Sequence, residues 1–137
     1  MGLSRGEMRT AVTVFVVGGV LCLLWLVFAP EAEERVALHR LRADLGQLEQ
    51  RYQGTVYSHS NIRMNDEGDA IYLTGDPAWR QQQNSWLEVT TIRLCEDFSD
   101  LRKKNGVKGD RCTAVIVDNS GTTMAEYDSS VGEVYRP

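Results

Sequence analysis

The feature that most constrains this chain is a stretch of nineteen residues, 11–29, that contains no charged side chain. As an α-helix rising about 1.5 Å per residue it would extend roughly 28 Å, close to the thickness of a bilayer hydrocarbon core. Trp25 lies near its end, where an aromatic ring is expected at a membrane surface, and Pro30 follows directly. We therefore predict a transmembrane helix over residues 10–30.

The charges that flank this stretch predict its orientation. Arg5 and Arg9 precede it, and the residues that follow are mainly acidic: Glu31, Glu33, Glu34 and Arg35. Because basic residues stay on the cytoplasmic side, we expect residues 1–9 in the cytoplasm and residues 31–137 in the periplasm or outside the cell. This describes a single-pass protein of the inner (plasma) membrane. A cleaved signal peptide has the same order of regions, but its apolar part is usually about 7–15 residues long.

Residues 31–53 read as an amphipathic juxtamembrane helix. Its apolar residues follow heptad spacing, one every three or four positions: Leu38, Leu41, Leu45, Leu48 and Tyr52. Two interpretations fit this leucine stripe. It is either a short oligomerisation stalk that faces another chain, or a helix that packs on the sheet of its own domain. Packing on the helix's own domain is the more common arrangement for an apolar stripe.

Residues 54–137 alternate between strand and helix patterns and predict one extracytoplasmic domain. Apolar alternation and turn residues predict a hairpin over 55–64 and 70–74, and Asp76-Pro77 is typical of a helix start. Either one helix runs from 77, or a second helix restarts at Ser85 and continues to 104. Strands are expected at 112–118 and 122–127, with an edge strand within 131–135. The predicted class is α+β: a small antiparallel sheet in ββαββ(β) order with one long helix packed on it.

Three cysteines are present, and Cys22 lies inside the predicted membrane span. Cys95 is placed on the long helix and Cys112 opens the strongest strand. Because an extracytoplasmic compartment is oxidising, we predict a disulfide between Cys95 and Cys112. A loop of this length corresponds to about 3 kcal/mol of stabilisation in the chain-entropy description. The alternative is two buried free thiols.

The sequence holds no recognisable catalytic, metal or cofactor motif. His39 and His59 fall in different elements, and the acidic residues Glu96, Asp97 and Asp100 are expected on a solvated face with the neighbouring Arg93, Arg102 and Lys103. We therefore expect no enzyme activity, metal or cofactor. The net charge of −4 and the absence of a basic face also argue against a nucleic-acid partner.

Trp79 and Trp86 flank a polar stretch and admit two interpretations. Aromatic residues near a helix start anchor partner proteins in some folds and fill the core in others. Together with the leucine stripe they are the candidate interface residues of the chain.

The segment from Val115 to Thr122, VIVDNSGT, resembles the hairpin of membrane-proximal sensor domains of the Cache and PAS type. This resemblance implies an extracytoplasmic sensor or small-ligand-binding domain.

The layout is also similar to that of type IV pilins, which are filament subunits, although stretch 11–29 lacks their glutamate. Only about ten residues precede the span, too few for a signalling domain. We therefore predict a structural or assembly subunit of a cell-envelope complex, whose partners are the membrane, other protein subunits and further copies of itself.

Overall fold

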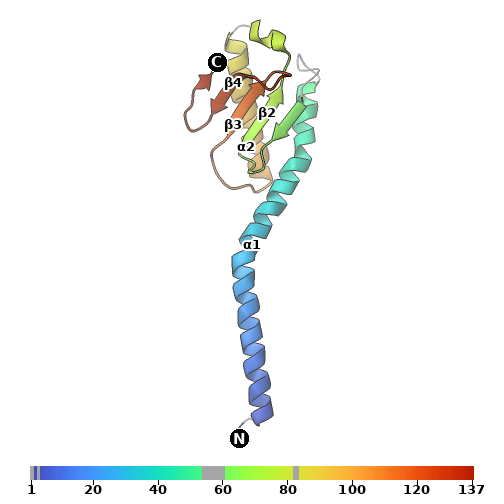
Figure 1. The fold of residues 1–137 in the computed structure, drawn as a ribbon, viewed down its shortest axis with the longest axis vertical. Helices are drawn as coiled ribbons and strands as arrows, with labels where there is room; N and C mark the ends of the chain where they lie inside the picture. Colours follow the sequence, from blue (N-terminus) through green and yellow to red (C-terminus); the bar gives the residue numbers. More distant parts are fainter. Residues whose placement is uncertain (1, 3, 54–60, 82–83) are drawn as a thin grey trace. The chain divides into compact units, whose positions relative to one another are not determined.

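The computed structural model describes residues 2, 4–53, 61–81 and 84–137, and its fold is α+β (Figure 1). The helices are α1 (Arg5–Gln53), the 3₁₀ helix η1 (Pro77–Gln81) and α2 (Asn84–Lys104). The strands are β1 (Asn61–Met64), β2 (Ala70–Thr74), β3 (Thr113–Val117), β4 (Thr123–Asp128) and β5 (Val134–Tyr135). The chain forms two compact units, Met1–Arg35 and Val36–Pro137.

The first unit is the N-terminal part of α1, and it starts with a capping box. The backbone N–H of Ser4 donates to Glu7 Oε2 at 2.8 Å, and the N–H of Glu7 donates to Ser4 Oγ at 3.3 Å. These two bonds satisfy backbone donors that a helix start otherwise leaves unpaired. Thr10 and Thr13 donate their hydroxyls to the carbonyls four residues earlier, so neither polar side chain is left unsatisfied in an apolar setting.

Helix α1 continues through Pro30 without a break, whereas the sequence predicted one helix ending at 30 and another beginning at 31. A proline inside a helix removes one backbone donor and crowds the preceding turn, but it does not always end the helix. Here the apolar and amphipathic segments are parts of a single 49-residue helix. Among the described residues, α1 is the helix that is long and apolar enough to cross a membrane.

The second unit carries one sheet with strand order β1-β2-β3-β4-β5. Neighbouring strands are antiparallel except β2 and β3, which are parallel from Ala70↔Thr113 to Thr74↔Val117. The sequence predicted a purely antiparallel sheet, and that part of the prediction is wrong. The connection between β2 and β3 contains η1 and α2. A helical crossover of this length returns the chain to its starting end, which makes the next strand parallel.

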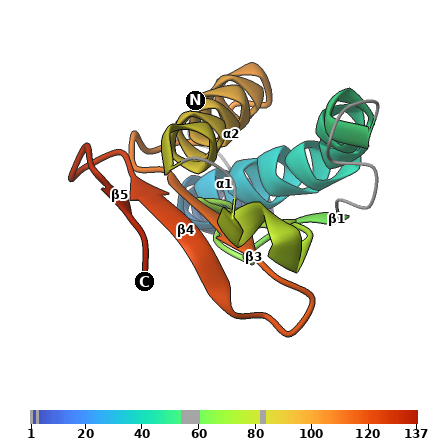
Figure 2. The same ribbon diagram turned by 90° about the horizontal axis from the view of Figure 1, so that it is seen from above.

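The helices of the second unit lie on one face of the sheet, as Figure 2 shows for α2 and the C-terminal part of α1. The two helices are antiparallel neighbours. Asp44 on α1 contacts Lys104 at 3.6 Å near the end of α2, whereas the Tyr52 hydroxyl donates to Asp97 Oδ2 at 2.9 Å, two turns earlier on α2. The core lies between this helical layer and the inward side chains of the strands.

Most of the predicted elements are present within a residue or two. The helix after β2 restarts, as one of the two alternatives proposed, with η1 first and α2 from Asn84. The tail adds β5 as an edge strand. The predicted strand segment at 55–60, including His59, and glutamines 82–83 lie outside the described residues.

Candidate functional site

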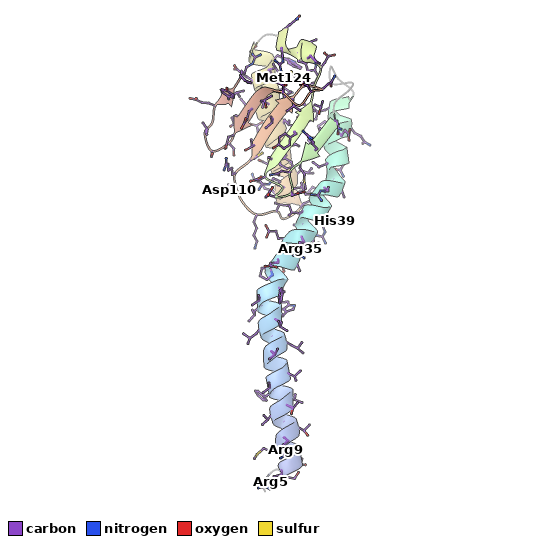
Figure 3. The ribbon with its side chains drawn as sticks, in the orientation of Figure 1. Arg5, Arg9, Arg35, His39, Asp110 and Met124 are labelled. Atoms are coloured by element: carbon purple, nitrogen blue, oxygen red, sulfur yellow. The ribbon has the colours of Figure 1, made fainter. Side chains whose placement is uncertain are left out.

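No described part of the chain buries the predicted membrane segment. Its large apolar side chains are exposed, from 47% at Leu24 to 86% at Phe15, and Trp25 is 72% exposed. Arg5 and Arg9 are also exposed and lie on the first turns of α1, whereas Arg35 lies beyond the apolar stretch (Figure 3). An exposed apolar surface of this extent is typical of segments that contact a membrane or another protein.

The leucine stripe has the opposite surroundings. Leu41, Leu45, Leu48 and Tyr52 are all less than 9% exposed and belong to the core of the second unit, and Leu38 packs against that core. These side chains fill their own domain, the alternative that the sequence favoured. They are therefore not available as an interface to another chain, because the two α-helices and the sheet already enclose them.

The two tryptophans form an edge-to-face pair with ring centres 5.4 Å apart. Trp79 is buried in the core and Trp86 is half-buried against it. Gly75 allows this arrangement, because a Cβ atom at that position would lie 2.2 Å from two carbon atoms of the Trp79 ring. Trp79 is thus a core residue whose indole lies against Gly75, directly after β2, and Trp86 is the more accessible of the pair.

Cys95 and Cys112 lie side by side, as the proposed bridge requires. Both are free thiols in this structure and both are buried, and each Sγ lies 3.4 Å from the backbone oxygen of the other residue. The hydrogen bond with the Cys112 thiol, followed by burial, raises the pKa of Cys95 above its ordinary value. The proximity agrees with a disulfide, which stays a prediction.

A shallow groove of about 350 Å³ runs beside this cysteine pair. It is formed by α2 and β4 and lined by seven residues: Cys95, Glu96, Ser99, Asp100, Lys103, Tyr127 and Ser129. A second groove, of about 240 Å³, lies between the two helices, where Arg51 contacts Asp97 at 3.5 Å. Both are lined largely by charged and polar side chains, whereas ordinary small-molecule sites are mostly apolar; of the two, the groove beside the cysteine pair reaches the usual volume of roughly 300–1,000 Å³.

Arg102 is the residue that sequence reasoning misplaced most clearly. It was expected on a solvated face, but it is 4% exposed. Its Nη1 donates to the carbonyl of Arg111 at 2.6 Å and its Nη2 to the carbonyl of Lys108 at 3.2 Å, and the guanidinium lies 6.0 Å from the centre of the Phe98 ring. Arg102 therefore holds the loop between α2 and β3. The available signal was the glycine-containing turn NGVKGD, residues 105–110, because a buried carbonyl in such a turn, here that of Lys108, needs a donor.

The predicted acidic face on α2 is only partly solvated. Asp97 is half-buried and accepts from Tyr52, whereas Glu96 and Asp100 are exposed. Within the described ranges, no three His, Cys, Asp or Glu side chains lie close enough together to hold a metal ion. Comparison of the chain with protein-family models, with curated proteins and with solved structures finds no match.

Proposed function

We propose that this chain is a single-pass membrane protein whose domain, Val36–Pro137, lies outside the cytoplasm and binds other subunits of an envelope complex. The observation that carries the proposal is the contrast within α1. Residues 11–28 expose apolar side chains on every side, whereas between Ala37 and Tyr52 one stripe of apolar side chains is buried in a folded domain. A helix that is apolar all round is suited to lipid, and an amphipathic helix is suited to a protein surface.

The charges at the ends of the apolar segment support the orientation. Arg5 and Arg9 lie on its N-terminal side, and Glu31, Glu33 and Glu34 follow it. The positive-inside preference then keeps the N-terminus cytoplasmic. In that topology Cys95 and Cys112 are in a compartment where disulfides form.

Topology is tested by labelling single introduced cysteines with a membrane-impermeant maleimide in intact cells. Lys108→Cys lies on an exposed loop of the domain, and Gly2→Cys lies before the span. The native chain is the background control, since Cys95 and Cys112 are buried and Cys22 lies in the apolar segment. We expect labelling of Lys108→Cys alone. Labelling of Gly2→Cys with protection of Lys108→Cys would reverse the orientation.

Partner binding is tested by purifying the full chain in mild detergent and identifying stoichiometric partners by mass spectrometry. The matched control is Leu41→Asp, which keeps the span but places a carboxylate in the domain core. A partner held by the native chain and lost from this variant supports binding through the domain. Purification without protein partners but with a bound small molecule would instead support a ligand-binding domain, for which the groove beside Cys95 is the candidate.

A further inference from the structure

The sheet has a second face, which the helices leave open, and its side chains form a defined pattern. The pairing register places one residue from every strand in a single row across this face: Arg63, Tyr72, Val115, Glu126 and Tyr135. Their neighbours along each strand, such as Ile71 and Ile116, point the other way into the core, because successive strand residues alternate between faces. We call this row, with the outward residues beside it, the outer face.

The outer face carries opposite charges at separate positions. Arg63 on β1 is exposed, with its guanidinium carbon 5.3 Å from the centre of the Tyr72 ring, and Glu126 on β4 is half-exposed. None of the ion pairs between described residues includes either side chain. Between them lies Val115, which is buried yet is not part of the core on the helical side. The row thus has an apolar centre and one unpaired charge on each side.

We propose that the outer face binds a second copy of this chain, around a two-fold axis that runs along β3. Rotation about this axis reverses the strand order, so β1 lies opposite β5 of the second copy and β2 lies opposite its β4. Val115 lies at the centre, buried beneath its neighbours, and the contacts come from the more exposed residues on either side of it. The Tyr72 hydroxyl meets Glu126 of the second copy, and Arg63 lies within reach of the same carboxylate. The contacts of Glu126 with Tyr72 and Arg63 lie off the axis and each occurs twice, as an isologous interface requires.

The place where α1 enters the second unit supports a two-fold axis parallel to the strands rather than one perpendicular to them. Leu38, near the start of the second unit, packs against Gly68 in the β1–β2 turn, and Arg42 contacts Asp66 there at 3.4 Å. The segment that leads to the span therefore enters the unit at the turn end of the sheet. An axis along the strands keeps both turn ends on the same side, so in both copies α1 enters the second unit from the same side. This step rests on the proposed function, because it requires both spans to enter one membrane.

The size of the face predicts a weak dimer that depends on the membrane. Five strands of two to six residues, about 4.8 Å apart, cover no more than roughly 24 by 17 Å, or about 400 Å² for each copy. A stable interface between soluble proteins needs about 800 Å² per partner. Anchoring two copies in one membrane raises their effective concentration, which compensates for the small area.

The test is cross-linking of the full chain in native membranes. Thr113, two residues before Val115 on β3, also faces outward and lies close to the proposed axis. A short bismaleimide should link Thr113→Cys to the same residue of a second copy. The matched control is Arg93→Cys, which is exposed on α2 and should give no cross-linked dimer.

Charge reversal gives the decisive comparison. In the Thr113→Cys background, we expect Arg63→Glu or Glu126→Arg to lower the dimer yield roughly tenfold or more, since like charges then face each other at two symmetric positions. Combining the two reversals should restore the yield, and Arg93→Glu should leave it unchanged. Restoration would not occur if the single variants had only unfolded the domain.

Three outcomes would overturn the dimer: no cross-link at Thr113→Cys, a yield equal to that of Arg93→Cys, or a yield insensitive to both reversals. The last result would indicate association through the span alone. These failures are distinguishable from a failure of the proposed topology, because labelling of Lys108→Cys in intact cells reports topology independently. An accessible Lys108→Cys without cross-linking overturns the dimer and leaves the topology intact.

Discussion

Helix α1 contains two apolar segments that differ in solvent exposure. Between residues 11 and 28 the apolar side chains surround the helix and stay exposed, whereas between 38 and 52 they occupy one stripe and are largely buried. Both segments have regular helical backbone, so helix formation does not separate them. The two segments differ in how their apolar residues are distributed around the helix axis. A stripe on one side packs against one surface, whereas apolar residues on all sides suit an apolar medium. The two segments can therefore be tested with identical substitutions.

The largest expected effect comes from placing an aspartate in each segment. Leu41→Asp buries an unpaired carboxylate at a fully enclosed position and should lower the free energy of unfolding of the domain by more than about 4 kcal/mol. Leu21→Asp, at a position 60% exposed in the proposed span, should leave domain stability unchanged. Protease resistance of the domain in membranes measures both. Equal sensitivity of the two variants would remove the distinction between the segments.

The cysteine pair gives the next largest effect. It tests the same comparison between the two segments, because Cys95 and Cys112 lie in the domain whereas Cys22 lies in the exposed apolar segment. If Cys95 and Cys112 are bridged, Cys112→Ser should lower stability by about 3 kcal/mol, and reduction of the native chain should have a similar effect. Cys22→Ser in the span is the matched control and should change nothing. Non-reducing mass spectrometry of a tryptic digest should find the 95–112 linked peptides. Free thiols at both positions after preparation under oxidising conditions would contradict the bridge.

Arg102 predicts a smaller loss. Arg102→Met keeps an aliphatic side chain over Phe98 but removes the donors to the carbonyls of Lys108 and Arg111. We expect a loss of about 2 kcal/mol, measured by chemical denaturation of the full chain in detergent. Arg93→Met, on the exposed side of the same helix, is the control. A stability equal to that of the native chain would show that the loop does not depend on Arg102.

Local patterns in the sequence predicted the elements well. Residues 70–74 form β2, residues 113–117 form β3 and residues 84–104 form α2, all close to the bounds that the sequence predicted. The closeness of Cys95 and Cys112 was also predicted. These features depend on residues near one another in the sequence or on one short connection.

What the sequence did not predict depends on the three-dimensional arrangement. The parallel pairing of β2 with β3 follows from the path of the crossover, which no local pattern records. The heptad spacing of Leu41 and Leu45 describes a helix face but does not say whether that face meets the same chain or another. Arg102 resembles the other basic residues at the end of α2, and only the folded loop identifies it as a donor to buried carbonyls. The row from Arg63 to Tyr135 exists only once the register of all five strands is known.

The smallest expected effect concerns two carboxylates, one in each unit, that accept hydrogen bonds from serine residues. Hydrogen bonds from the Ser130 hydroxyl and N–H, and then from Arg111, lower the pKa of Asp128 to about 2, and bonds from Ser4 lower the pKa of Glu7. A carboxyl whose pKa is lower in the folded state stabilises the fold above its ordinary pKa, and this contribution is lost as the pH falls. For Asp128 the loss should therefore occur between about pH 4 and pH 2 and amount to less than about 1 kcal/mol, because solvent screens the pair with Arg111.

Carboxyl NMR of the full chain in detergent measures both titrations. Asp128→Asn should remove the corresponding part of the acid sensitivity of the domain, whereas Glu7→Gln should alter only the first turn of α1 and leave domain unfolding unchanged. If Asp128 instead titrates at its ordinary value, the turn that Ser130 and Arg111 define does not persist in solution. If Glu7→Gln shifts the unfolding of the domain, the two units are energetically coupled through α1, and the contrast between its two segments is one of surroundings rather than of independent stability.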